Sequence, residues 1–245
     1  APQGPELEQY VKTIESYNLR ESLPTQWRLD ICSSAGYLDS LPDAGRGDIL
    51  VTAGNNSRKT DNISAAVAKG YNVLADKPMA IDYAGYERLK QSFDEAVSRG
   101  LIVRDIMTER FDDINVLIKA VMSDGRLFGH SQGVEINDVH HFYKEVSGSA
   151  VRRPAWYYDT AQQGEGIVDV TTHFIDLIMW WCFPGQSISV VDIDNLSGSH
   201  YPTLVSAEEF ERSTGHHGWP EYLADRVHSD TLSVMCNGKV SFLVR

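Results

Sequence analysis

The sequence predicts an α/β fold in which a Rossmann-like doubly wound parallel sheet, incomplete at its N-terminal side, precedes an α+β domain with an open, largely antiparallel sheet. Up to about residue 106, short apolar segments alternate with helical patterns, as strands and crossover helices do in a parallel sheet. Beyond residue 106 this alternation is lost, and the last strand patterns follow one another as antiparallel neighbours do. We therefore expect two domains, residues 1–106 and residues 107–245, the second also incomplete at its C-terminus.

The first domain is predicted from apolar residues that recur at helical or strand spacing. Leu7, Tyr10, Val11 and Ile14 share one helical face, and Asp82 stands where the N-cap of a later helix is expected. The expected elements are a helix over 6–18, a strand over 27–32, a short helix over 35–41, a strand over 48–53, a helix over 60–69, a strand over 73–75, a helix over 82–99 and a strand over 101–106.

The second domain has a less regular pattern. A long stretch rich in aromatic residues, 140–165, lies between its first strand and its strongest helix, and such a loop inside a compact domain is usually functional or disordered. The expected elements are a helix over 111–123, a strand over 128–139, a helix over 166–183, a surface loop over 195–222, and strands over 188–193, 228–235 and 239–244.

Composition narrows the function. A net charge of −12 argues against nucleic acid and anionic membranes as partners, and no apolar run approaches the roughly 18 residues that span a bilayer. Cys32, Cys182 and Cys236 are too far apart for a disulfide framework and indicate buried thiols. We expect a cytoplasmic protein, although the chain begins at Ala1 and leaves a removed leader and a periplasmic location open.

The strand over 73–75 runs directly into Asp76, Lys77 and Pro78. Ligands of open α/β sheets gather at the carboxyl ends of the strands, which is where Lys77 lies. Pro78 fixes the backbone after the lysine and disfavours a helical conformation at Lys77. Lys77 is therefore a candidate for substrate chemistry, and the simpler interpretation is a surface lysine.

The helix over 166–183 carries a second candidate group. Asp169 and His173 are four residues apart and therefore share one face, which Asp176 continues. Carboxylates beside an imidazole can carry a proton near neutral pH. The alternative is an ordinary Asp–His pair on a solvated helix face.

Taken together, these stretches resemble the glucose–fructose oxidoreductase, inositol dehydrogenase and rhizopine catabolism (Gfo/Idh/MocA) family of sugar oxidoreductases. The resemblance covers roughly residues 47–183. Asp76-Lys77-Pro78 is similar to the family's Glu-Lys-Pro motif, and Asp169 and His173 match its Asp-x-x-x-His pair. Two further segments match in the same order, Thr52-Ala53-Gly54-Asn55-Asn56 for Thr-Pro-Asn and Arg110-Phe111 for Arg-Phe.

The resemblance implies an NAD(P)-dependent oxidoreductase acting on a hydroxyl of a sugar or polyol, with a dinucleotide-binding first domain and a second domain for substrate binding and oligomerisation. It implies NAD or NADP as cofactor, a carbohydrate substrate, and a homodimer or homotetramer. From the residues themselves we expect no metal. The implied catalytic residues are Lys77, Asp169 and His173. The implied cofactor-binding residues are Thr52, Ala53, Asn55, Asp76, Lys77 and Pro78. The implied substrate-binding residues are Arg110, Trp156, Tyr157, Asp169 and His173.

Two departures from the family leave alternatives open. No Gly-x-Gly-x-x-Gly loop occurs, so we expect that its strand and loop are missing from the chain as given. Ser57 and Arg58 stand where the family usually has a histidine. Relatives that hydrolyse glycosides with NAD and no net redox change remain an alternative, as does a non-catalytic binding protein. For Trp156 and Tyr157, the alternative to sugar binding is packing of the long loop onto the domain. We consider a metal at His140 and His141 improbable, because neighbouring residues on a strand point to opposite faces.

Overall fold

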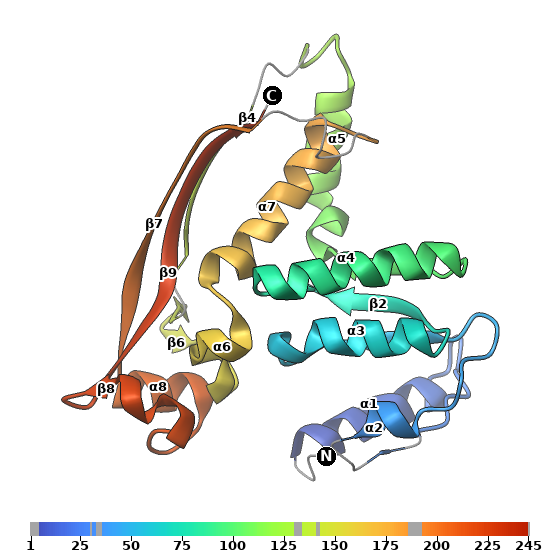
Figure 1. The fold of residues 1–245 in the computed structure, drawn as a ribbon, viewed down its shortest axis with the longest axis horizontal. Helices are drawn as coiled ribbons and strands as arrows, with labels where there is room; N and C mark the ends of the chain where they lie inside the picture. Colours follow the sequence, from blue (N-terminus) through green and yellow to red (C-terminus); the bar gives the residue numbers. More distant parts are fainter. Residues whose placement is uncertain are drawn as a thin grey trace. The chain divides into compact units, whose positions relative to one another are not determined.

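The computed structural model describes residues 5–29, 31–32, 36–129, 134–140, 143–185 and 193–244. Contacts divide the chain into two compact units, Ala1–Asp43 and Ala44–Arg245, and Figure 1 labels their elements. The predicted boundary at residue 106 falls within the second unit, between a parallel and an antiparallel sheet. These two sheets confirm the predicted fold class.

The first unit contains the two predicted helices, α1 (Pro5–Leu19) and α2 (Tyr37–Ser40). The strand expected over 27–32 is wrong for residues 27–29 and 31–32, which form no strand. The Asn18 side chain explains this, because its amide donates to the Trp27 carbonyl and accepts from the Trp27 N–H, each at 2.8 Å. Cys32 is exposed, which corrects the expectation of a buried thiol there.

The parallel sheet has the order β1 (Ile49–Thr52), β2 (Asn72–Asp76) and β3 (Val103–Ile106). The crossover helices are α3 (Lys59–Ala68), which follows a short 3-10 helix η1 (Asn56–Arg58), and α4 (Tyr83–Ser98). Asp82 caps α4 as predicted, since its carboxylate accepts from the Gly85 N–H at 2.6 Å. The register pairs Thr52 with Ala75 and Asp76 with Ile106, so the carboxyl ends of the three strands lie along one edge.

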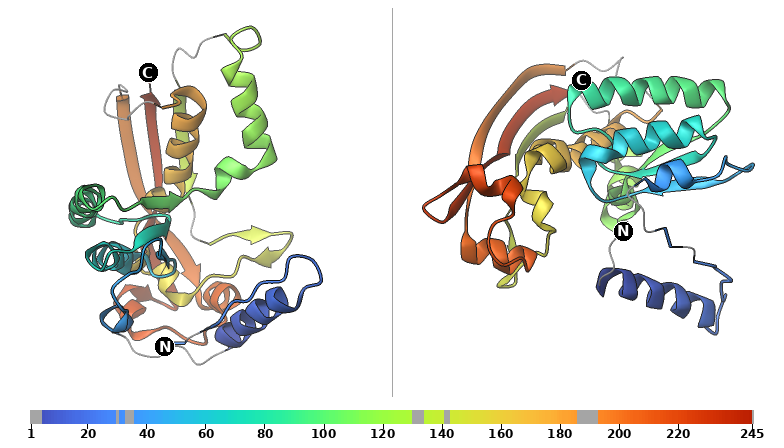
Figure 2. Two further views of the ribbon diagram at one scale, coloured as in Figure 1. Left: turned by 90° about the vertical axis from the view of Figure 1, so that its right-hand side faces the viewer. Right: turned by 60° about the horizontal axis from the view of Figure 1, so that its bottom comes forward.

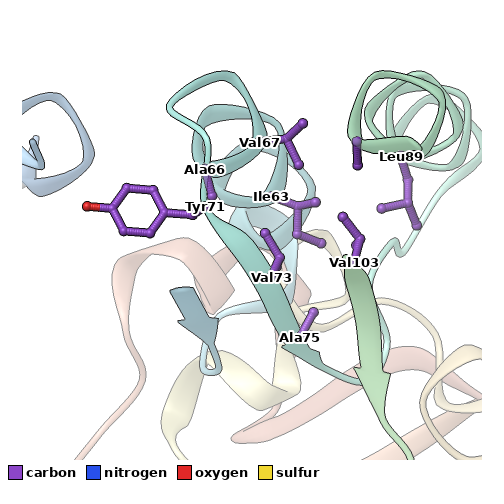
Figure 3. Packing of buried hydrophobic residues seen from close by; sticks show 9 residues of the cluster. Ile63, Ala66, Val67, Tyr71, Val73, Ala75, Leu89 and Val103 are labelled. Atoms are coloured by element: carbon purple, nitrogen blue, oxygen red, sulfur yellow. The ribbon is translucent and has the colours of Figure 1, made fainter. Parts of the chain in front are cut away.

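One face of this sheet packs on α3 and α4. Figure 3 shows Ile63 and Val67 of α3 and Leu89 of α4 against Val73 and Val103 of the strands. These side chains are almost completely buried, and each contributes about 1.5–3 kcal/mol of hydrophobic stabilisation. The opposite face is apolar and exposed at Ile49, Val51 and Leu74.

The antiparallel sheet has the order β4 (Val134–His140), β9 (Thr231–Val244) and β7 (Ile193–Ser206), with β8 (Val227–His228) paired to β9. Figures 1 and 2 show its long, curved strands with α7 beside them. The register between β7 and β9 shifts between Tyr201 and Thr203, where Pro202 offers no N–H to the ladder. The two strands expected over 228–235 and 239–244 are thus one strand, and residues 188–192 lie outside the described residues.

The surface loop expected over 195–222 is wrong. Its first part belongs to β7, and its second part forms α8 (Ala207–Thr214) followed by the start of the 3-10 helix η5 (Glu221–Arg226). Ser206 and Glu209 form a capping box at the start of α8, and Gly215 ends it in the left-handed conformation. Because Val205 and Phe210 are fully buried, this region is part of a hydrophobic core.

Helices and a short hairpin complete the second unit. The helix α5 (Asp113–Ser123) forms as predicted, but Ile114 and Leu117 on its apolar face are exposed. The aromatic stretch contains the hairpin of β5 (Glu145–Val146) and β6 (Ser149–Ala150), the 3-10 helix η3 (Ala155–Tyr158) and α6 (Thr160–Gln163). The predicted helix α7 spans Gly166–Cys182. None of the described helices combines the length and the apolar character needed to cross a bilayer.

Candidate functional site

A pocket of about 530 Å³ opens at the carboxyl ends of the parallel strands. Its walls come from the loop after β1, the end of β2, the 3-10 helix η2 (Thr108–Phe111) that follows β3, the aromatic stretch, and the first turns of α7. The residues that line it are Gly54, Asn56, Asp76, Lys77, Glu109, Lys144, Arg153, Pro154, Trp156, Tyr157, Gln163, Asp169, Val170 and His173. Lys77 and His173, which the sequence suggests from separate stretches, therefore share one pocket.

Lys77 is held by the first turn of α7. Its Nζ lies 2.8 Å from Oδ1 of Asp169 and 2.9 Å from the Asp169 carbonyl oxygen. Asp169 is buried and stands near the helix N-terminus, where the helix dipole favours a negative charge. A partly buried, hydrogen-bonded ion pair of this kind fixes the ammonium group at one place in the pocket.

A second lysine, Lys59, contacts the carboxyl end of β2. It is 1% exposed, and its Nζ lies 3.1 Å from the Lys77 carbonyl oxygen and 3.8 Å from Oδ2 of Asp76. Burial lowers the pKa of Lys59, while the charge of Asp76 acts in the opposite direction. Oδ1 of Asp76 accepts from the Lys77 N–H at 2.9 Å, so both groups hold the backbone around the Lys77–Pro78 bond, which is cis.

His173 lies on α7 one turn after Asp169. Burial is the main cause that lowers its pKa, the positive charge of Lys77 adds to the effect, and Glu109 opposes it. The imidazole is therefore neutral near pH 7 and able to accept a proton. Among the residues that the structure describes, none forms a hydrogen bond with its buried Nδ1.

Tyr157 connects the pocket to the hydrophobic core that contains Val205 and Phe210. Its hydroxyl donates to Oδ2 of Asp169 at 3.2 Å, so this carboxylate is held on both oxygens, by Lys77 and by Tyr157. Burial, with the nearby charge of Asp169, raises the pKa of Tyr157 and keeps the phenol protonated. The guanidinium carbon of Arg153 lies 4.7 Å from the centre of the Tyr157 ring.

The other residues predicted to bind the cofactor also lie at the strand ends, but they differ in burial and in their contacts. Thr52 is buried at the end of β1, Ala53 is exposed, and Pro78 is buried after Lys77. Asn55 caps η1 by accepting from the Ser57 N–H, and its amide donates to Oε1 of Gln162 at 2.7 Å. Of the predicted cofactor-binding residues, the pocket lining contains Asp76 and Lys77.

Arg110, predicted to bind substrate, is engaged elsewhere. Its Nε lies 2.7 Å from Oδ2 of Asp176, and its Nη2 also contacts the Asp176 carboxylate, which makes the pair bidentate. This hydrogen bonding raises the pKa of the Arg110 guanidinium. Trp156, the remaining predicted substrate residue, lines the pocket.

Several pocket residues are absent from the sequence-based prediction. Asn56 is buried, and its amide donates to the carbonyl and to Oε1 of Gln163, which joins the loop after β1 to α6. Arg153 and Glu109 also escape detection, as does the supporting Lys59. Asn56 stands in the Thr52–Asn56 segment without being named there as a site residue, whereas Lys59, Glu109 and Arg153 belong to no motif and are revealed only when distant segments come together.

No cluster of three metal-ligating side chains occurs among the residues that the structure describes. His141 and the side chain of His140 lie outside the described residues, so the predicted absence of a metal there stays a prediction.

The fold and the pocket together define the class. A parallel α/β sheet with a pocket at its strand ends, followed by an antiparallel sheet, is the architecture of Rossmann-like oxidoreductases. Residues 119–245 match the family described as "Putative oxidoreductase C terminal domain", and the chain belongs to this family. This match confirms the oxidoreductase family type inferred from the sequence motifs.

Solved structures agree with this assignment. A crystal structure of a putative oxidoreductase from Parabacteroides merdae ATCC 43184 is 34% identical over 99% of this chain and 57% of that chain, with a TM-score of 0.82. An oxidoreductase domain protein from Kribbella flavida shares the fold, at 19% identity over 69% of this chain and 41% of that chain, with a TM-score of 0.50. The chain thus spans little more than half the length of the Parabacteroides protein. No curated protein matches the chain.

Proposed function

We propose that the protein to which this chain belongs is an NAD(P)-dependent oxidoreductase that acts on a hydroxyl group of a sugar or polyol. The observation that carries the proposal is the shared pocket of Lys77 and His173 at the ends of the parallel strands. One group is a fixed ammonium and the other a neutral imidazole, the pair that removal of a hydroxyl proton requires. The family match supports an oxidoreductase in general.

The cofactor fits the strand ends of this pocket. Gly54 has a φ of +106°, and a Cβ added there would meet no atom within 4 Å, so the backbone is open to a flat ring. Gly54, Asp76 and Lys77 are the residues that would hold a nicotinamide dinucleotide at this edge, where ligands of parallel sheets bind. When bound, the nicotinamide supplies the hydride acceptor.

Lys77 and His173 would carry out the transfer of the substrate hydroxyl proton. Lys77 donates a hydrogen bond to the substrate hydroxyl oxygen and so favours the alkoxide-like form. His173, neutral because its pKa is lowered, accepts the hydroxyl proton. Asp169 orients Lys77 through the ion pair between them. General-base assistance of this kind contributes about 10²–10⁴-fold in rate.

The wall opposite the strand ends suits a carbohydrate. Trp156 is only partly buried and offers a flat apolar surface to the C–H faces of a pyranose, while the buried Tyr157 ring supports this wall from the core. Sugar binding is thus a role for the aromatic stretch beyond packing.

The test is steady-state turnover of the full-length protein with NAD⁺ or NADP⁺ and a panel of sugars and polyols. Continuous accumulation of reduced nicotinamide with at least one substrate is the expected result. Release of sugar from an aryl glycoside without such accumulation would point to the hydrolase alternative. Failure to bind either dinucleotide in a fluorescence titration would refute the proposal and favour a non-catalytic binding protein. The predicted homodimer or homotetramer is checked by sedimentation velocity on the same sample.

A further inference from the structure

The pocket has a charged group that the proposed proton chemistry does not use. Arg153 lines the same wall as Trp156 and Tyr157, and its main-chain N–H donates to the Ser213 carbonyl at 2.8 Å. This bond to the end of α8 fixes where the side chain begins. The guanidinium carbon then lies 4.7 Å from the centre of the Tyr157 ring.

This guanidinium lacks a full set of acceptors. Its Nε is buried and forms no hydrogen bond with any residue that the structure describes. A guanidinium has five N–H donors and no acceptor, and a partly buried donor left without a partner is unfavourable. Stacking on Tyr157 orients the planar group but leaves its N–H donors unfilled. A ligand in the pocket would supply the missing acceptor.

Arg153 and the reacting groups line different parts of the same pocket. The Tyr157 side chain separates them, because its ring contacts Arg153 and its hydroxyl reaches Asp169, the partner of Lys77. Arg153 and the Lys77–Asp169 pair therefore contact different parts of the Tyr157 side chain, the ring and the hydroxyl. A pyranose that places a hydroxyl beside Lys77 and His173 would direct its opposite substituent toward Arg153.

The charges that line the pocket indicate the chemical nature of the substituent that would face Arg153. Lys144 also lines the pocket and adds a further cation to it, while the carboxylate of Glu109 acts on His173 at the reacting end. A planar guanidinium pairs bidentately with a carboxylate or a phosphate. A phosphate, with a charge of about −1.5 to −2, would add more negative charge than a wall that also contains Asp76, Glu109 and Asp169 favours.

We infer that the substrate is a sugar acid, whose carboxylate binds Arg153 while one of its ring hydroxyls meets Lys77 and His173. This rests on the proposed function for the reaction itself, but the binding of the carboxylate is independent of it. Arg153 thereby becomes the residue that distinguishes acidic from neutral sugars.

The experiment measures binding to the full-length protein by titration calorimetry, with D-glucuronate and D-galacturonate as acid probes and D-glucose and D-galactose as their neutral counterparts. We expect at least one acid probe to bind about 10- to 100-fold more tightly than its neutral counterpart. Arg153→Met should remove that preference, and Arg153→Lys should retain part of it. The matched control is Arg152→Met, because Arg152 is exposed and does not line this pocket. Thermal melts show that each variant is folded.

Three results would overturn the inference: neither acid binding better than its neutral counterpart, D-glucose 6-phosphate binding better than both acids, or Arg153→Met weakening acid and neutral probes equally. Reduction of NAD⁺ and NADP⁺ is recorded with the same probes. Arg153-dependent binding of an acid without reduction of either dinucleotide by any substrate would refute the oxidoreductase proposal and support the inference about the acid. Oxidation of neutral sugars with no preference for acids would support the oxidoreductase proposal and refute the inference.

Discussion

The strand-end pocket and the core beneath β7 and β9 are buried regions of opposite character. The pocket is built from ion pairs, Lys77 with Asp169 and Lys59 with Asp76, which hold charged groups in fixed positions. The core is built from Tyr158, Val205, Phe210, Leu223, Leu232 and Val234, which hold each other by apolar contact. Buried ion pairs contribute little net stability, whereas buried aromatic rings contribute much.

Tyr157 belongs to both regions. Its ring packs in the aromatic core, and its hydroxyl holds Asp169 in the pocket. The core therefore supports the position of the Lys77–Asp169 pair. Substitutions that affect one region and leave the other intact test this division.

The largest effect is expected at Lys77. Lys77→Met keeps the length of the side chain but removes the ammonium that contacts Asp169, so turnover should fall about 10²–10⁴-fold. The melting temperature should fall as well, because the substitution leaves the buried Asp169 carboxylate without its cation, so turnover is compared in protein shown to be folded. Lys90→Met, at an exposed lysine of α4, is the control. Turnover like that of the wild type in Lys77→Met would contradict the role of this lysine.

The second effect is expected in the core. Phe210→Ala removes a ring that is 1% exposed and lies 4.8 Å from the Trp219 ring centre, so the free energy of unfolding should fall by about 3–5 kcal/mol. Denaturant unfolding measures it, with Phe174→Ala, at an exposed phenylalanine, as the control. Turnover of the remaining folded enzyme should persist. A loss of turnover as large as that of Lys77→Met, in protein that is still folded, would break the division between the regions.

The sequence predicts the parallel sheet well and the antiparallel region poorly, for a physical reason. The strands β1 and β2 contain short apolar runs next to an amphipathic helix, so the signal is local, as in Val73 and Ala75 beside Ile63 and Val67. In β7 and β9 the pairing is between segments distant in sequence, and only a few side chains, such as Val205 and Leu232, mark the buried face. Ser206-x-x-Glu209 was a local signal of α8 in the middle of the supposed loop.

The same distinction applies to the pocket. Lys77, Asp169 and His173 are detectable because short motifs surround them, and the structure places all three in one pocket. The residues that hold them are not detectable from the sequence. Lys59 contacts Lys77, and Arg153 contacts Tyr157, only in the folded chain. Arg110 shows the converse, because a motif marks it but its guanidinium binds Asp176.

A third test follows the electrostatic coupling inside the pocket. The positive charge of Lys77 contributes to lowering the pKa of His173, so Lys77→Met should move that pKa upward, and Lys90→Met should leave it in place. NMR titration of the ring measures it. Because the folded-state pKa lies below the unfolded value of about 6.5, His173 favours unfolding as pH falls below that value, and His173→Gln should reduce the loss of stability in acid. An unchanged His173 titration in Lys77→Met would mean that the two groups are not coupled.

The smallest effect is expected at the start of α8. Ser206 accepts from the Glu209 N–H at 3.2 Å, and the Glu209 carboxylate accepts from the Ser206 N–H at 2.8 Å, so each satisfies a main-chain donor at the helix end. Ser206→Ala should lower the free energy of unfolding by about 1 kcal/mol, measured by denaturant titration. Ser199→Ala, at an exposed position of β7, should leave it nearly unchanged. Turnover should not change. Because Phe210 lies one turn after this cap and packs in the same core as Tyr157, a change in turnover after Ser206→Ala would show that small shifts of the core alter the pocket.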